Sequence, residues 1–197
     1  MLVAPIKNLT YYISGHGYGH YARSIPVLRR LVADFKVYIK SEIQEPLFTK
    51  FLDAHYWPQS VDTGCKHSTS LAVDSEETFK CFKDFQNSSL LETEKLWLQE
   101  NQIALVLSDV ASMPLKAAHD LGIPSILIGN FTWHDIYNHL PGADKHKHLL
   151  QGLEEEYRCA DLHILPQCHL PPLQIGKSKE VGFLAQQGQN IHKNLER

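Results

Sequence analysis

Short apolar runs that alternate with amphipathic segments constrain the fold of this chain more than any other feature of its sequence. Runs of β-branched, aromatic and aliphatic residues occur at 9–14, 35–40, 104–108 and 125–129, and helical spacing of apolar residues follows most of them. Strands that alternate with helices specify an α/β fold with a mainly parallel sheet. Because the crossovers between parallel strands are right-handed, helices cover both faces. We therefore predict a three-layer, Rossmann-like, doubly wound sheet.

The weaker patterns complete this arrangement. We expect helices over 21–33, 46–54, 75–102 with an interruption near 87–89, 114–121, 134–140 and 149–159, and further strands at 56–61, 162–165 and 181–184. The segment 62–74 is rich in Thr, Ser, Gly and His and has no clear period, so we expect a loop there. Glu92 and Glu94 stand early in a helical piece, where acidic side chains suit the helix dipole.

Composition excludes several classes of protein. The chain of 197 residues is 43% hydrophobic and 21% charged, which argues against a disordered or fibrous protein. With 19 basic and 22 acidic residues and no polybasic tail, we expect no nucleic-acid partner. No signal-peptide pattern and no apolar stretch of membrane-spanning length is evident, so we expect a cytoplasmic protein and leave a peripheral membrane contact open.

The most informative segment is a glycine-rich loop between the first strand and the first helix. It reads Gly15-His16-Gly17-Tyr18-Gly19-His20. Glycines at this place allow unusual backbone angles and let an anion or a sugar approach the amides at the helix N-terminus. A dinucleotide-binding fingerprint has glycine where His20 stands, so an NAD-binding oxidoreductase with Glu42 as the ribose-binding acid is the less favoured alternative.

The two histidines of this loop are candidates for acid/base chemistry. His16 and His20 are four residues apart, as in a metalloprotease zinc motif, but the glycines disfavour a regular helix across both and no glutamate follows His16. We therefore expect no metal site. Two histidines in one loop at the strand ends favour acid/base or anion-binding work over loop packing.

Other polar residues follow strands that end at the same edge of the sheet, where doubly wound folds bind ligands. Asp109 closes a buried strand, where it could orient a histidine or cap the following helix. Arg23 could complete an anion pocket or lie on a solvated helix face. Asn130, Thr132 and Trp133 offer an amide, a hydroxyl and a stacking face for a sugar, with core packing as the alternative for Trp133.

Three sequence blocks resemble the N-terminal half of GT-B glycosyltransferases. The blocks are Tyr11–Arg23 (YYISGHGYGHYAR), Leu105–Val110 (LVLSDV) and Gly122–Tyr137 (GIPSILIGNFTWHDIY). The likeness is greatest to the glycosyltransferase-like domain of plant L-arabinokinases. In GT-B enzymes two Rossmann-like domains face each other across a cleft, and the N-terminal domain mostly holds the acceptor while the C-terminal domain mostly holds the nucleotide-sugar.

The resemblance implies roles for the strand-end residues. His20 takes the place of the base that removes a proton from the acceptor hydroxyl, and Asp109 that of its orienting partner. We expect substrate contacts from Gly15, His16, Gly17, Gly19, Arg23, Asn130, Thr132 and Trp133. Such enzymes commonly need no metal, and we expect no cofactor. The implied substrates are a UDP-sugar donor and a sugar or glycoconjugate acceptor.

The resemblance also implies a domain organisation. One GT-B N-terminal domain would occupy residues 1–185, and residues 186–197 would be a linker or the start of a C-terminal domain. We expect this half to be incomplete alone and to need that missing domain or a partner chain, while a homodimer that covers the same face stays open. The alternative function is a noncatalytic sugar-binding or regulatory module.

Overall fold

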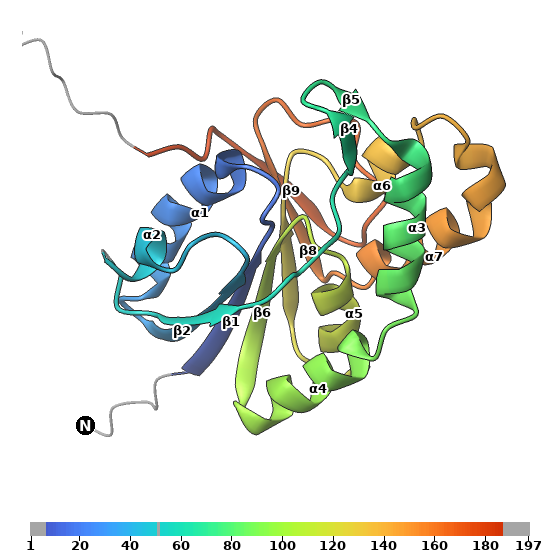
Figure 1. Ribbon diagram of the computed structural model, residues 1–197. Helices are drawn as coiled ribbons and strands as arrows, with labels where there is room; N and C mark the ends of the chain where they lie inside the picture. The colour runs from blue at the N-terminus through green and yellow to red at the C-terminus, as the bar shows by residue number, and fades with distance from the viewer. Residues whose placement is uncertain (1–6, 51, 187–197) are drawn as a thin grey trace, which may run out of the picture.

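A parallel sheet forms the centre of the computed structural model, which describes residues 7–50 and 52–186 (Figure 1). Its strands run in the order β3-β2-β1-β6-β7-β8-β9. Their bounds are β1 (Lys7–Ile13), β2 (Phe35–Ser41), β3 (His55–Pro58), β6 (Ile103–Asp109), β7 (Ser125–Ile128), β8 (Leu162–Pro166) and β9 (Ser178–Val181). Every neighbouring pair is parallel. The predicted doubly wound α/β class is therefore confirmed.

Helices cover both faces of this sheet, which gives three layers (Figure 1). On one face lie α1 (Tyr18–Leu31) and α2 (Pro46–Thr49). On the other lie α3 (Ser75–Gln86), α4 (Leu90–Glu100), α5 (Met113–Asp120), α6 (Trp133–Tyr137) and α7 (Lys147–Arg158), with the short 3₁₀ helix η1 (Ala143–His146) before α7. This arrangement follows from right-handed crossovers, because the chain winds in opposite directions from β1.

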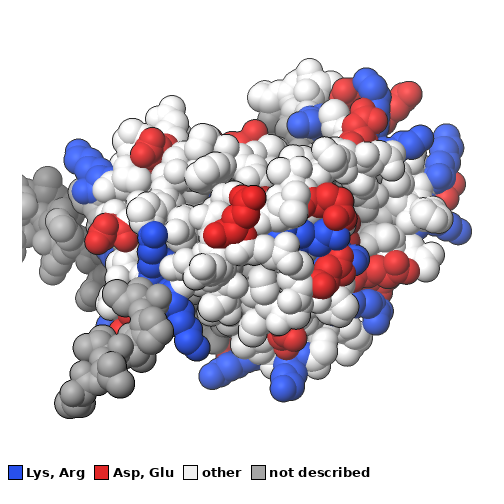
Figure 2. Space-filling view, turned by 90° about the horizontal axis from the view of Figure 1, so that it is seen from below, with Lys and Arg blue, Asp and Glu red and all other residues white. Residues whose placement is uncertain are grey.

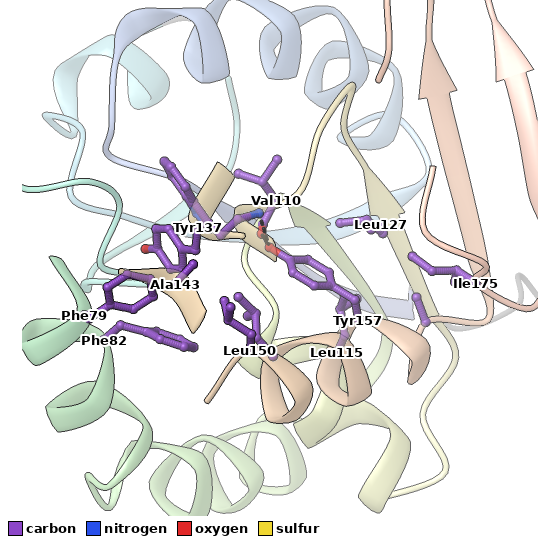
Figure 3. Close-up of a cluster of buried hydrophobic side chains, with 13 residues drawn as sticks. Phe79, Phe82, Val110, Leu115, Leu127, Tyr137, Ala143, Leu150, Tyr157 and Ile175 are labelled. Carbon is purple, nitrogen blue, oxygen red and sulfur yellow. Dashed lines mark hydrogen bonds between the residues drawn. The ribbon is translucent and has the colours of Figure 1, made fainter. Parts of the chain in front are cut away.

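The alternation of side chains along β1 shows why both faces are covered. Tyr11 and Ile13 point into the core beneath α1 and α2, whereas Tyr12 points into the core beneath α4 and α5. A third group of buried side chains, which includes Phe79 and Tyr157, packs beneath α3, α6 and α7 (Figure 3). A strand that is buried on both faces has a nearly continuous run of apolar residues, and the sequence of β1 is such a run.

Several boundaries differ from the predictions, and α2, for example, ends at Thr49 instead of residue 54. Helix α1 begins at Tyr18 instead of residue 21, because Gly17, at φ 112°, already ends the loop in a conformation that favours glycine. The expected loop 62–74 contains a hairpin of β4 (His67–Thr69) and β5 (Ala72–Val73), strands too short to show an alternation. Strand β9 precedes the expected 181–184, because its exposed polar residues at the edge of the sheet carry no apolar pattern.

The expected linker over 186–197 lies outside the described residues except for residue 186. No helix in the described part of the chain is long and apolar enough to cross a membrane. Figure 2 shows basic and acidic side chains interspersed over one face of the molecule. On that face, as far as its residues are described, we see no broad basic patch of the kind that binds a phosphate backbone.

The order of the strands determines where a ligand site can form. The chain leaves β1 toward β2 and β3 on one side, and continues from β6 to β9 on the other. Doubly wound folds bind ligands beyond the carboxyl ends of the strands at such a switch point. Ile13 and Asp109, the last residues of β1 and β6, are direct partners across this junction. The glycine-rich loop and Asp109 therefore lie at the same crevice.

Candidate functional site

His20 and Asp109 meet across the junction between β1 and β6. His20 lies in the first turn of α1, and its Nδ1 atom is 3.0 Å from Oδ1 of Asp109. Asp109 has no exposed surface, and His20 is only 7% exposed. The structure thus brings together the two residues that the sequence analysis placed in a histidine–carboxylate pair.

Asp109 has further partners on α1. The Nε atom of Arg23 donates to Oδ2 of Asp109 over 3.1 Å, and a second nitrogen of the same guanidinium donates to Oδ1. Ser24 donates to Oδ2 over 3.2 Å. Burial alone would raise the pKa of Asp109, but the hydrogen bond from His20 and the charge of Arg23 outweigh it and hold that pKa below its ordinary value. Asp109 is therefore an ionised anchor and not a helix cap.

Arg23 also fixes the orientation of Asn130. Its Nη1 atom donates to Oδ1 of Asn130 over 2.7 Å. Because a guanidinium can only donate, the amide NH₂ of Asn130 is left for another partner. The Nη2 atom of Arg23 lies 2.9 Å from Nδ1 of His20. In a neutral His20, Nδ1 either carries the proton and donates to Asp109 or lacks it and accepts from Arg23. In the first tautomer Nε2 is a hydrogen-bond acceptor, and in the second it is a donor.

These side chains border a hollow of about 420 Å³, which lies within the usual size range of small-molecule sites. It is lined by His16, Gly19, His20, Arg23, Asn130, Phe131, Pro166, Gln167, Cys168, Phe183 and Leu184. Two imidazoles, a guanidinium and two amides therefore converge on one space. Such a set can bind hydroxyl groups and move a proton, which is the chemistry that the sequence analysis expected here.

The sequence analysis missed Asp62, the carboxylate partner of His16. Nε2 of His16 lies 3.3 Å from Oδ1 of Asp62. Asp62 is buried and accepts hydrogen bonds from Ser14 Oγ over 3.2 Å and from Trp133 Nε1 over 2.9 Å. A signal was present, because Asp62 directly follows the predicted strand 56–61 just as Asp109 follows 104–108. Asp62 also begins the segment 62–74, whose lack of a clear period predicts a loop and gives no sign of a partner for His16.

Two predicted contact residues serve the scaffold instead of the hollow. Thr132 is buried, and its hydroxyl and backbone amide form a capping box with Asp135 at the start of α6. Trp133 is 8% exposed and packs in the core beneath α6 and α7. Neither residue lines the hollow that contains His20. The core-packing alternative for Trp133 is the one that the structure favours.

The three glycines that were predicted to contact a substrate line two different hollows. Gly19 lines the hollow that contains His20, whereas Gly15 and Gly17 line a neighbouring hollow of about 370 Å³ beside Glu42. A Cβ atom on Gly15 would lie 3.0 Å from that of Glu42, so the loop passes close to the end of β2. Within residues 7–50 and 52–186, no group of three or more His, Cys, Asp or Glu side chains could hold a metal ion.

Comparison with solved structures defines the class of fold. The chain is similar to a UDP-glucosyltransferase of Polygonum tinctorium (TM-score 0.57, 16% identity, 94% of this chain and 54% of that chain). It is also similar to UGT2 of Phytolacca americana (0.59, 16%, 100% and 58%) and to MurG of Acinetobacter baumannii (0.52, 13%, 97% and 49%). The chain therefore has the fold of a GT-B glycosyltransferase-like domain and spans about half the length of these proteins.

A curated protein matches at the level of sequence. Over 172 residues the chain is 29% identical to L-arabinokinase of Arabidopsis thaliana, and the match covers 82% of this chain and 17% of that protein. No protein-family model matches the chain. The similarity agrees with the resemblance seen in the three sequence blocks, and the chain corresponds to a small part of that longer relative.

Proposed function

We propose that this chain is the acceptor-binding half of a nucleotide-sugar-dependent glycosyltransferase in which His20 is the catalytic base. The observation that carries the proposal is the contact between His20 and buried Asp109 at the edge of a polar hollow. Asp109 would hold the proton on Nδ1 of His20, so that Nε2 accepts the proton of an acceptor hydroxyl. The oxygen of that hydroxyl would then attack the anomeric carbon of a UDP-sugar, while the bond from that carbon to the diphosphate breaks and UDP leaves.

The donor in this proposal is a UDP-sugar held by a second domain or a partner chain. One similar structure, that of UGT2, is a complex with UDP-2-fluoro-glucose and pterostilbene, and this chain spans 58% of it. The acceptor is a sugar or glycoconjugate, and neither a metal nor a cofactor takes part. The half is incomplete alone and acts in the cytoplasm, and residues 186–197 are its linker or the start of a C-terminal domain. A homodimer or a peripheral membrane contact is compatible with this arrangement.

A specific contact favours a second candidate, a noncatalytic sugar-binding or regulatory module. Arg23 already neutralises Asp109 and lies 2.9 Å from Nδ1 of His20. If Nδ1 accepts from Arg23, the proton of the neutral imidazole resides on Nε2, which then cannot act as a base. The similarity to L-arabinokinase, whose name describes a kinase, is compatible with a domain of this kind.

The tautomer of His20 discriminates between the two candidates. We expect ¹⁵N chemical shifts of the neutral imidazole to show a protonated Nδ1 and an unprotonated Nε2. Asp109→Asn offers an amide that can donate to Nδ1, so this variant should move the proton to Nε2. Protonation of Nε2 in the unaltered chain would contradict the role of base and favour the module.

Ligand titration tests the class of substrate. Chemical-shift titrations with monosaccharides, UDP-sugars and NAD should show sugar binding that falls about tenfold in His20→Ala and Asp109→Ala. The first variant removes a hydrogen-bonding partner from the hollow, and the second removes the carboxylate that holds His20 and Arg23 in place. Lys116→Ala, which alters an exposed ion pair on α5, is the matched control and should bind as the unaltered chain does. Tight binding of NAD without sugar binding would overturn both candidates in favour of the oxidoreductase.

A further inference from the structure

A second histidine–carboxylate pair faces the same hollow as the first. His16 lines the hollow and lies against buried Asp62, as His20 lies against buried Asp109. We propose that His16 is a second acceptor-binding residue, and that the acceptor presents two neighbouring hydroxyl groups, one to each histidine. This inference rests on the proposed function and narrows the acceptor to a vicinal diol, such as a sugar or another polyol.

Contacts from several segments hold this pair in place. The hydroxyl of Ser14, which follows β1, accepts from the backbone N–H of His16 over 3.3 Å and donates to Oδ1 of Asp62. Trp133, at the start of α6, donates to Oδ2 of Asp62 and meets the ring of His16 edge to face at 5.6 Å. Both oxygens of Asp62 are thus engaged. A histidine that merely filled a loop would not need a buried carboxylate with partners of its own.

Gly64 shows that the position of the His16 ring is built into the backbone. Gly64 has φ +53°, and a Cβ atom there would lie 2.3 Å from three ring atoms of His16. No side chain fits between the two residues, so the ring packs directly on the backbone of this loop. The ring is confined between Gly64 and Trp133 and leaves little freedom for another orientation.

The buried side of the ring determines what His16 offers to a ligand. Nε2 has no exposed surface and no hydrogen-bond partner among the described residues, and it lies 3.3 Å from Oδ1 of Asp62, while the side chain as a whole is 28% exposed. Burial raises the pKa of Asp62, and the hydrogen bond from Trp133 and the nearby His16 oppose that rise. A proton on Nε2 is favoured by the carboxylate, so Nδ1 of the neutral ring keeps its lone pair for the hollow.

Two nitrogens that accept hydrogen bonds in one hollow favour a ligand with two hydrogen-bond donors. In the base form of His20, Nε2 also presents a lone pair, so each imidazole accepts one O–H group. The guanidinium of Arg23 in the same lining disfavours a cationic donor such as an amine. The amide NH₂ of Asn130 can donate to a hydroxyl oxygen. A ligand with two hydroxyl groups can satisfy these partners.

The test compares a diol with a single alcohol. We would titrate the chain with cis-1,2-cyclohexanediol and with cyclohexanol and follow the imidazole signals of His16 and His20. The diol should shift both sets of signals with one common dissociation constant, at least about tenfold lower than that of cyclohexanol, because it makes one more hydrogen bond. Equal affinities for the two probes, or signals of His16 that do not respond to the diol, would overturn the proposal.

Two variants connect the effect to His16. Gly64→Ala should displace the ring and remove the preference for the diol, while cyclohexanol still shifts the signals of His20. Gly142→Ala is the matched control, since Gly142 also has positive φ, at +82°, but a Cβ atom there meets nothing within 4 Å. If Gly64→Ala does not fold, His16→Gln removes the same ring nitrogen and should lose the same preference. A preference that survives in the folded variant contradicts the role of His16.

The outcome is separable from that of the proposed function. If Nε2 of His20 proves to be protonated, His20 is not a base, yet the diol would still shift His16 and bind as a ligand of a noncatalytic module. If His20 has the expected tautomer but His16 ignores the diol, glycosyl transfer stands and the vicinal-diol acceptor fails.

Discussion

Two clusters of buried charge in the described part of the chain differ in their access to a hollow. The strand-end cluster consists of His20, Arg23, Asp109 and Asn130. The lysine cluster consists of Tyr12, Lys40, Gln59 and Glu94. Both pair a cation with a carboxylate next to the sheet, so burial of charge by itself does not distinguish a functional site from a structural one.

The lysine cluster is closed. Lys40 and Glu94 are 1% and 2% exposed, and Nζ of Lys40 donates to Oε1 of Glu94 over 2.6 Å. Tyr12 donates to the same oxygen, and Gln59 donates to Oε2 over 2.8 Å. The ammonium group of Lys40 also lies 3.4 Å from the centre of the Trp97 ring. None of these residues lines either of the hollows described above.

The strand-end cluster, in contrast, contains hydrogen-bonding groups that no contact within the cluster uses. One nitrogen of His20 and the amide NH₂ of Asn130 are not used by the contacts within the cluster, and both residues line the hollow. Glu94, by comparison, has both oxygens engaged. Hydrogen-bond donors and acceptors that have no partner within their cluster and lie beside a hollow therefore indicate a ligand site better than buried charge does.

The largest effect should come from breaking the lysine cluster. Glu94→Ala leaves the ammonium group of Lys40 buried without its carboxylate, which typically costs about 3–5 kcal/mol of unfolding free energy. The double variant Lys40→Met/Glu94→Leu removes both charges and should be less destabilised than Glu94→Ala, because neither buried charge is left unpaired. Urea denaturation of the two variants and the unaltered chain measures this difference.

An exposed ion pair provides the control for that experiment. Asp120→Ala breaks the contact of Asp120 with Lys116 on α5, where both side chains are partly exposed. Such pairs contribute at most about 1 kcal/mol. If Glu94→Ala were no more destabilising than Asp120→Ala, the lysine cluster would not stabilise the fold. The distinction between a structural lysine cluster and a ligand-binding strand-end cluster would then be wrong.

The two clusters should respond to opposite ends of the pH scale. The pKa of Asp109 is below its ordinary value in the folded chain, so the unfolded chain binds more protons and this stabilisation is lost as the pH falls below about 4. Burial lowers the pKa of Lys40, although its contacts with Glu94 oppose that shift. The folded chain therefore binds fewer protons there, and stability rises with pH on the approach to about 10.4.

Denaturation curves over pH can separate these contributions. Asp109→Asn should flatten the acid limb of the stability profile and leave the alkaline limb unchanged. The double variant Lys40→Met/Glu94→Leu should flatten the alkaline limb alone, because it leaves neither charge buried without its partner. A loss of the acid limb in this double variant would mean that the two clusters are coupled.

Sequence predicted the strand-end cluster better than the lysine cluster for a physical reason. Parallel strands bring their carboxyl ends to one edge, so residues that follow β1 and β6 must be neighbours, and this rule was sufficient to place His20 near Asp109. No such rule places Lys40 against Glu94, which are 54 residues apart on different elements. The prediction that Glu94 serves the helix dipole was wrong, because its side chain is buried in the ion pair.

Local patterns had a similar limit elsewhere. The glycine-rich loop and the short apolar strands are local signals, and the fold class followed from them. Asp62 joins His16 through a segment without period, and β9, which has Val181 as its one apolar residue, carries no apolar pattern that would mark it as a strand. Such features depend on packing between distant segments, which propensity and periodicity do not describe.

The smallest effect should come from Thr132, which lies where the strand-end cluster borders the scaffold. Thr132→Ala removes the side-chain acceptor that caps α6 and should cost about 1 kcal/mol of unfolding free energy, whereas Thr132→Ser keeps the hydroxyl and should cost less. Because Thr132 does not line the hollow, the shifts of His16 and His20 with the diol should not change in Thr132→Ala. Loss of diol binding with unaltered stability would show that the strand-end cluster extends to Thr132 and that the capping box of Thr132 is part of the ligand site.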